Sequence, residues 1–161
     1  MMVVTMVVVA SPDDIFVLCH TGGDGAVSWV ERVHPETLET LATSEHLTGG
    51  PAWPGGAAVH PNGDVYVVFG NHAHRLSRSL QVVASRELPR VRPYNSFVVL
   101  PDGHLVTKDF GGSRPGNEME EPFAPTQLVV LEPTGLNIVA TLDLAEASIA
   151  RLSANENDVY V

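Results

Sequence analysis

The sequence predicts an all-β protein built from antiparallel strands, and three observations lead to that prediction. The 14 glycines and 12 prolines are spread along the 161 residues, so they divide the chain into many short segments. Those segments are rich in Val, Ile, Leu, Thr, Phe and Tyr, which favour strands over helices. Finally, one strand–turn–strand pattern recurs along the chain. An antiparallel sandwich or barrel of short strands is the alternative that the first two observations leave open.

The recurring pattern consists of two short apolar segments joined by a tight turn. Its turns include Asn62-Gly63 and Asp102-Gly103, which are typical of hairpins because glycine adopts the positive φ that such turns need. The four copies cover residues 11–17, 60–67, 100–107 and 153–161. Their equivalent positions Asp14, Asp64, His104 and Asp158 are 50, 40 and 54 residues apart.

A second hairpin follows each of the first three copies. Its turns lie at 34–37, 77–79 and 132–135, so each unit is expected to hold four short antiparallel strands. A four-stranded unit that recurs at this spacing is typical of a β-propeller blade. The sequence therefore predicts a partial β-propeller with about three and a half four-stranded antiparallel blades.

This pattern resembles the broad superfamily of β-propellers in which a Pro-Asp-Gly or Pro-Asn-Gly turn joins the first two strands of a blade. Within it, Arg92-Pro93-Tyr94-Asn95 before the turn at 101–103 shows a local similarity to the gluconolactonase/SMP-30-type propellers, which are six-bladed. That resemblance implies a lactonase- or esterase-like hydrolase with a divalent cation, Ca²⁺ or Mg²⁺ rather than Zn²⁺, and Asn95 as a metal ligand. Tyr94 is an insertion relative to the family spacing, and the family's glutamate is missing from 55–58.

We expect a single domain over residues 1–161. Its blades are predicted at about 2–44, 56–86 and 96–142, with an incomplete fourth at about 148–161. Three and a half blades leave open sheet edges, each a row of unpaired backbone groups. The chain is therefore expected to be a fragment of a longer propeller, the alternative being an open stack completed by a partner copy. Self-association through strand edges follows from either reading.

The lengths of the connections predict where a site lies. The longer connections, at 21–26, 44–55, 87–95 and 111–126, all emerge at one end of the predicted blades, whereas the opposite end has only short turns. Long loops on a rigid scaffold are where binding sites usually form. The polar residues expected at this end are His20, Asn71, His72, Arg90, Arg92, Tyr94, Asn95, Lys108, Asp109 and Arg114.

Two pairs of charged residues suggest specific chemistry. Lys108 and Asp109 are the candidate catalytic residues, as a general base and a substrate clamp, with an ordinary ion pair as the alternative. Arg90 and Arg92 share a direction in an extended segment and could bind a carboxylate through two parallel hydrogen bonds, unless both are simply solvated. Arg92 and Tyr94 are predicted ligand-binding residues.

Histidines are the other candidate ligands. His72 and His74 are two apart, so in a strand both imidazoles face one side, which suits a transition metal with His20 as a third ligand. His20 and His72 are otherwise predicted to bind a small molecule. A polar loop that is rich in histidine by chance is the alternative.

Composition excludes several classes of partner. Nine Lys and Arg stand against nineteen Asp and Glu, and the net charge of −10 argues against binding nucleic acid or an anionic membrane surface. No apolar run reaches the roughly 18–20 residues of a membrane span, and the cytoplasm is the expected compartment. Cys19 is alone, so it forms no internal disulfide and is expected to be a small core residue.

Three functions remain open at this point. The leading expectation is a small-molecule-binding or hydrolase/lactonase-like propeller with its site at the long-loop end, near the mouth of a central channel. The alternatives are a non-catalytic protein-interaction scaffold and a quinoprotein-like redox propeller. Whether the protein is an enzyme is left open.

Overall fold

The structure is a computed structural model that describes residues 2–11, 13–22, 25–51, 55–110, 125–145 and 150–161. These residues form fourteen strands and no helices, so the all-β prediction is confirmed for this part of the chain. Among the described residues there is accordingly no helix that is long and apolar enough to cross a membrane.

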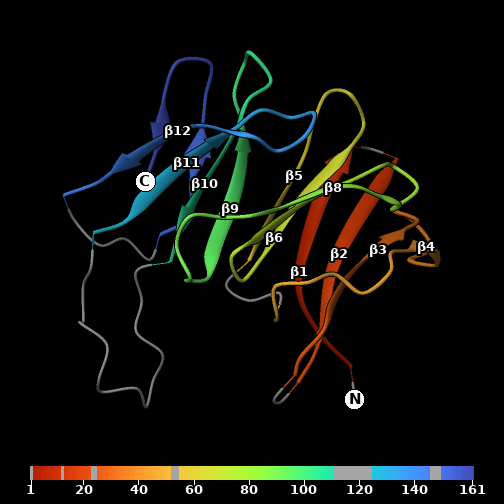
Figure 1. The fold of residues 1–161 in the computed structure, drawn as a ribbon. Helices are drawn as coiled ribbons and strands as arrows, with labels where there is room; N and C mark the ends of the chain where they lie inside the picture. Colours follow the sequence, from red (N-terminus) through yellow and green to blue (C-terminus); the bar gives the residue numbers. More distant parts are fainter. Residues whose placement is uncertain (1, 12, 23–24, 52–54, 111–124, 146–149) are drawn as a thin grey trace.

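The strands form three four-stranded sheets and one two-stranded hairpin (Figure 1). The first sheet contains β1 (Met2–Ser11), β2 (Asp14–Thr21), β3 (Ser28–Val33) and β4 (Thr40–Thr43). The second contains β5 (Gly56–Val59), β6 (Val65–Phe69), β7 (His72–Leu76) and β8 (Val82–Glu87). The third contains β9 (Tyr94–Val99), β10 (Leu105–Asp109), β11 (Gln127–Leu131) and β12 (Ile138–Asp143). The terminal hairpin contains β13 (Ser153–Ala154) and β14 (Val159–Tyr160).

Within each sheet, every strand pairs antiparallel with the next strand along the chain. The tight turns that the sequence predicts at Asn62-Gly63 and Asp102-Gly103 join β5 to β6 and β9 to β10. Gly63 and Gly103 have φ values of 90° and 88°, which is the left-handed conformation that favours glycine in hairpin turns. Glycine is thus required at the two turns that gave the clearest sequence signal.

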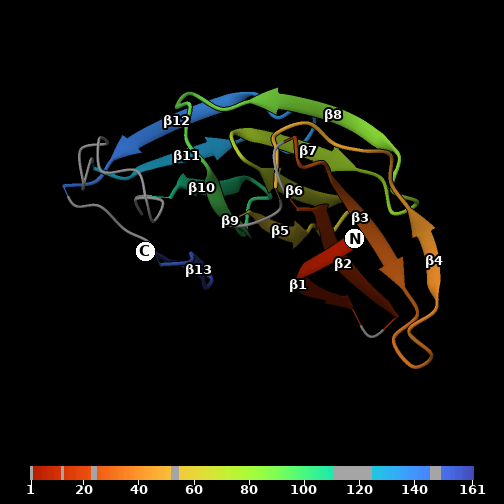
Figure 2. The same ribbon diagram turned by 90° about the horizontal axis from the view of Figure 1, so that it is seen from below.

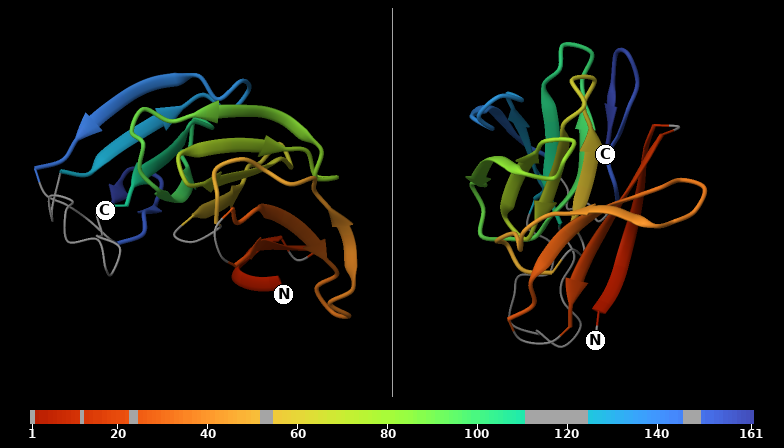
Figure 3. Two further views of the ribbon diagram at one scale, coloured as in Figure 1. Left: turned by 60° about the horizontal axis from the view of Figure 1, so that its bottom comes forward. Right: turned by 90° about the vertical axis from the view of Figure 1, so that its right-hand side faces the viewer.

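The sheets are arranged as an arch. Figure 2 shows β1, β5, β9 and β13 on its concave side and β4, β8 and β12 on its convex side, and Figure 3 shows the same arch from another angle. The first strands of the second and third sheets approach closely at Gly56. A Cβ atom there would lie 2.3 Å from the backbone nitrogen and Cα of Ser96, so only glycine fits.

Apolar side chains fill the space between neighbouring sheets. Phe16 and Leu18 of β2 pack with Val65 and Val67 of β6 between the first and second sheets. The intervening residues of β6, Tyr66 and Val68, face the other way, so all five residues of β6 are buried. Tyr66 and Val68 pack against the third sheet, with the side chains of Phe97, Leu105, Val129 and Leu131.

A leucine occupies the same place in the turn between the last two strands of each sheet. Leu38, Leu80 and Leu136 all have positive φ, at 58°, 65° and 59°, which is uncommon for a residue with a branched side chain. Leu80 is buried in the cluster between the first and second sheets, and Leu136 in the cluster between the second and third. Leu38, in contrast, is 66% exposed.

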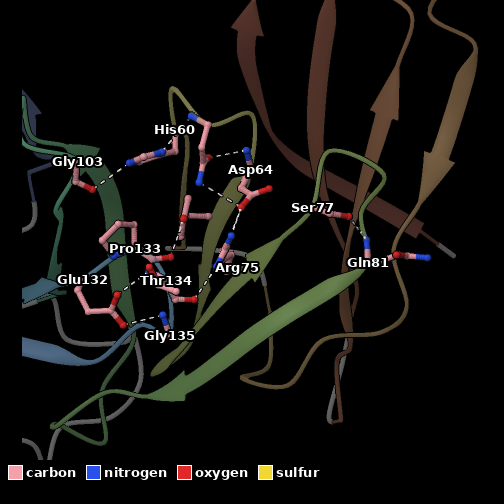
Figure 4. Close-up of polar contacts among 12 residues, drawn as sticks. His60, Asp64, Arg75, Ser77, Gln81, Gly103, Glu132, Pro133, Thr134 and Gly135 are labelled. Carbon is pink, nitrogen blue, oxygen red and sulfur yellow. Dashed lines mark hydrogen bonds and ion pairs between the residues drawn. The ribbon is translucent and has the colours of Figure 1, made fainter.

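Polar contacts reinforce the packing of the third sheet on the second at the short-turn end (Figure 4). Tyr66 Oη donates a hydrogen bond to the carbonyl of Pro133 at 2.7 Å. Arg75 Nη1 donates to the carbonyl of Thr134 at 2.7 Å and also pairs with Asp64 of its own sheet. The turn after β11 is therefore fixed against the second sheet by one phenol and one guanidinium.

The close approach at Gly56 predicts a specific sensitivity. Gly56→Ala forces the first strands of two sheets apart and should lower the free energy of unfolding by about 1–3 kcal/mol, as overpacking does. Gly22→Ala is the matched control, because a Cβ at residue 22 meets no atom within 4 Å. Urea denaturation of the two variants checks this, and equal midpoints would contradict it.

Candidate functional site

The candidate site lies where the strands of the third sheet begin and end at the long-loop end. β9 begins at Tyr94, which pairs with Asp109 at the end of β10. β11 begins at Gln127, which pairs with Asp143 at the end of β12. Because adjacent strands are antiparallel, starts and ends alternate along one edge of the sheet. This edge therefore gathers four polar residues from four strands.

Arg90 joins two of these strands. Its Nη1 lies 2.9 Å from Oδ2 of Asp109, and its Nη2 lies 2.8 Å from Oδ1 of Asp143. Asp109 also accepts a hydrogen bond from the backbone N–H of Gln127 at 2.6 Å, and Arg90 donates another to the carbonyl of Pro125. Arg90 is thus engaged by three acceptors within the protein, which leaves it fewer donors for the carboxylate ligand predicted to be bound by Arg90 and Arg92 together.

Tyr94 is part of the same cluster. Its side chain is completely buried, and its hydroxyl accepts a hydrogen bond from the backbone N–H of Arg90 at 3.2 Å. Burial raises the pKa of the Tyr94 phenol, and the nearby Asp109 raises it further, while the hydrogen bond from Arg90 opposes both. Tyr94 therefore stays neutral and holds segment 88–93 against the sheet.

Lys108 and Asp109 lie on opposite faces of β10, because successive strand residues alternate. Both side chains are completely buried. Burial lowers the pKa of Lys108, and the carboxylate of Asp109 partly offsets this effect. The described ion pairs of Asp109 join it to Arg90 and, at 4.0 Å, to Arg92. The ion pairs described for Asp109 are thus with arginines, and neither Lys108 nor Asp109 is exposed.

Asn95 is 2% exposed, and its amide Nδ2 donates a hydrogen bond to the carbonyl of Ala150 at 3.3 Å. The next residue, Ser96, accepts a hydrogen bond from the backbone N–H of Leu152. These contacts join β9 to the segment that precedes the terminal hairpin. Within the described residues no group of three or more His, Cys, Asp or Glu could hold a metal ion. A hard cation prefers six or more oxygen ligands, so the donors here do not fit the metal that the resemblance implies.

The two histidines of β7 face one side, as expected, and their rings stack at 6.4 Å between centroids. His74 is nearly fully buried, and its Nε2 donates to the carbonyl of Thr48 while its Nδ1 accepts from the hydroxyl of Ser85, both at 2.8 Å. Since both nitrogens are used within the protein, His74 has a structural role. His20 lies on the first sheet, where its ring bonds the carbonyl of Thr21.

Cys19 is completely buried, in line with the expected core position. Burial raises the pKa of its thiol to about 11, and the carboxylate of Glu31 contributes. The thiol is therefore protonated and unreactive at neutral pH.

The recesses formed by described residues include one at the long-loop end and two at the short-turn end. The one at the long-loop end has a volume of about 190 Å³ and is lined by Gly49, Pro51, Gly70, Asn71, Val91, Arg92 and Pro93. Two larger ones lie at the short-turn end. One, of about 380 Å³, includes Asp14, His60 and Arg78. The other, of about 360 Å³, lies between the turn at 100–102 and residues 155–159. Of the polar residues expected at the long-loop end, Asn71 and Arg92 line the first of these recesses. Arg114 lies outside the described residues.

The sequence reasoning did not identify this recess because its walls come from three separate connections. Gly49, Asn71 and Arg92 are 22 and 21 residues apart and carry no common motif. The tight contact between Gly49 and Gly70 shapes its floor, since a Cβ on either glycine would clash with the other segment's backbone. Positive φ at both positions is the local reason for glycine there.

Known proteins give a likeness in fold only. No family model matches the chain, and a search of curated proteins found no match. A protein of unknown function from Bacteroides caccae matches with a TM-score of 0.58 and 14% identity over 90% of this chain and 48% of that one. The chain thus spans about half the length of that protein. Two further structures match with lower TM-scores. The computationally designed Ika8 protein has a TM-score of 0.46 and 9% identity over 97% of this chain and 66% of that one. A eukaryotic initiation factor has a TM-score of 0.30 and 12% identity over 89% of this chain and 56% of that one.

The buried carboxylate of Asp109 is expected to matter for stability. Asp109→Ala leaves Arg90 without its buried carboxylate partner and the Gln127 N–H without its acceptor, and it should cost about 2–4 kcal/mol of unfolding free energy because both groups stay partly buried. Asp143→Ala is the control, since Asp143 is largely exposed and should cost less than about 1 kcal/mol. Chemical denaturation distinguishes the two, and a larger loss for Asp143→Ala would refute the assignment.

His74 predicts a pH dependence. Burial lowers the pKa of its imidazole below the ordinary value of 6.5, the neighbouring His72 adds to this, and the hydrogen bond to Thr48 opposes it. The unfolded chain therefore binds a proton that the native state does not, so stability falls as the pH drops below about 6.5. Urea denaturation at about pH 7.5 and about pH 5.5 should show a smaller loss for His74→Gln than for the natural chain. Equal losses would exclude this role for His74.

Proposed function

We propose that the three sheets are consecutive blades of a β-propeller and that the terminal hairpin is the first half of a fourth. The support is the order of the strands in each sheet, the packing of each sheet face on the next, and the gathering of β1, β5, β9 and β13 on the concave side of the arch (Figure 2). The extent of the domain over residues 1–161 belongs to the same proposal, as does the number of further blades in the propeller.

The function proposed for this module is binding of a small carboxylate-bearing molecule in the recess beside Arg92. The supporting observation is the difference between two arginines. Arg90 neutralises Asp109 and Asp143 at 2.8–2.9 Å, whereas the contact of Arg92 with Asp109 is 4.0 Å long. Among the described arginines at this end, Arg92 therefore retains guanidinium donors for an anion, and it lines the recess.

The recess suits a molecule of modest size. Its volume of about 190 Å³ is below the roughly 300 Å³ at which drug-sized pockets begin. A planar guanidinium binds a carboxylate through two parallel N–H···O hydrogen bonds. Asn71 supplies an amide, and Val91 with Pro93 supplies apolar walls. No catalytic role is proposed for Lys108 and Asp109, since both side chains are completely buried.

Calorimetric titration with gluconate, the carboxylate product of the lactonases that the chain resembles, tests this function. The natural chain should bind it, and Arg92→Ala should weaken binding at least tenfold because the charged donor is lost. Arg86→Ala is the matched control, since Arg86 has the same charge and bonds Asn137, away from the recess. Equal affinity for Arg92→Ala and the natural chain would exclude the recess as the site.

The interaction-scaffold alternative has one observation in its favour. Ile138, Val139 and Leu142 of β12 are 41%, 57% and 58% exposed on the outer strand of the third sheet. Exposed apolar side chains gathered on an outer strand are typical of a surface that another polypeptide covers. No gluconate binding by the natural chain would favour this second function.

A further inference from the structure

The exposed leucine of the first sheet lacks the packing that its two counterparts have. A residue other than glycine held at positive φ is strained, and this conformation persists where the surroundings compensate. Burial between sheets compensates at Leu80 and Leu136. Leu38 has the same backbone conformation at φ 58° but no such burial among the described residues.

The turn that carries Leu38 resembles one of the two buried turns in detail. His34-Pro35-Glu36-Thr37-Leu38 corresponds to Glu132-Pro133-Thr134-Gly135-Leu136, with proline and leucine at the same places. In the second of these turns, the carbonyl of Pro133 accepts the hydrogen bond from Tyr66 Oη, and Tyr66 belongs to the same apolar cluster as Leu136. A turn of this type therefore receives a tyrosine from the preceding sheet.

The chain has a second tyrosine at the position equivalent to Tyr66. Each lies two residues after the equivalent aspartates Asp64 and Asp158, and the same position in the first sheet is Phe16. Phe16 has no hydroxyl, and the turn it faces, with Leu80, has Ser77-Arg78-Ser79 and no proline. Tyr160 is 53% exposed and belongs to the terminal hairpin, which lies at the other end of the arch from β3 and β4 (Figure 2). One proline–leucine turn and one tyrosine thus remain exposed in the described residues.

From this correspondence we infer that Leu38 and Tyr160 form an interface between two copies of this chain. The terminal hairpin of one copy packs on the outward face of the first sheet of the other, where Ile15 and Val17 are only partly buried. Tyr160 covers Leu38 and donates its hydroxyl hydrogen to the carbonyl of Pro35, as Tyr66 does to Pro133. The inference uses the packing between sheets and does not depend on the proposed ligand recess.

The arch allows two copies to cover each other's exposed leucine turn and tyrosine hairpin. Each copy carries one Leu38 face and one Tyr160 hairpin, at opposite ends of the arch (Figure 2). A head-to-tail contact that repeats gives either a closed ring or an open fibre, and two arches that meet at both ends close. The protein from Bacteroides caccae, of which this chain spans 48%, has a length consistent with two such halves in one polypeptide.

Sedimentation velocity on the full chain tests this inference, and a discrete dimer is expected at about 100 µM, where contacts of micromolar affinity are saturated. Tyr160→Phe removes one hydroxyl from each interface and should raise the dissociation constant at least about fivefold. Leu38→Gly should raise it more than tenfold. It also relieves the backbone strain, so the unfolding free energy of the monomer should not fall, which distinguishes lost contact from misfolding. Val83→Ser is the control, because Val83 is a similarly exposed apolar residue on β8.

Mixing two variants adds a test of the pairing itself. Leu38→Gly retains its tyrosine, and Tyr160→Ala retains its leucine, so a heterodimer of the two contains one intact interface. The mixture should therefore associate more tightly than either variant alone. A monomeric natural chain, a polydisperse aggregate, or a dimer unaffected by both Leu38→Gly and Tyr160→Phe would overturn the inference.

Discussion

Packing of one sheet face on the next is the interaction on which the rest of this structure depends. A four-stranded sheet of short strands has two faces, and only burial of at least one makes it stable. The second sheet is buried on both, which is why all five residues of β6 are inaccessible. A leucine in the turn before the last strand supports each contact, and it is held at positive φ at a cost that burial offsets. The gap between sheets also sets how closely their first strands approach, and Gly56 is the point where only a hydrogen atom fits.

The polar residues at the long-loop end divide into two groups as a result of this packing. Polar side chains that point between strands or sheets bind partners within the protein. Asp109 balances Arg90, Tyr94 holds the segment before β9, and His74 uses both ring nitrogens. Arg92 differs because it lies on the connection between two sheets, beside a recess, and its nearest described carboxylate is 4.0 Å away. Arg92 therefore keeps hydrogen-bonding capacity at the junction of two sheets.

The sequence allowed the strands and turns to be predicted because their signals are local. Asn62-Gly63 and Asp102-Gly103 specify hairpins through the conformation of glycine, and alternation of apolar residues marks the strands around them. Within the sheets, two to six residues separate each strand from the next except between β10 and β11, and such short connections explain why each sheet is a meander. Sequence reasoning also placed His72 and His74 on one side of a strand, and Cys19 in the core, since both depend only on strand period and polarity.

Tertiary structure decided which partner each polar side chain binds. The sequence suggested an ion pair between Asp109 and its neighbour Lys108. Adjacent strand residues face opposite ways, however, and the described partner of Asp109 is Arg90, from a connection 19 residues earlier. Leu38, Leu80 and Leu136 are equivalent in the sequence, yet two are buried and one is exposed, because burial depends on whether another sheet lies opposite. The sequence by itself determined the all-β class, the repeated strand order and the turns. Which charges are neutralised, which recess forms and which sheet face is left uncovered were settled by contacts between segments distant in the chain, which no local pattern encodes.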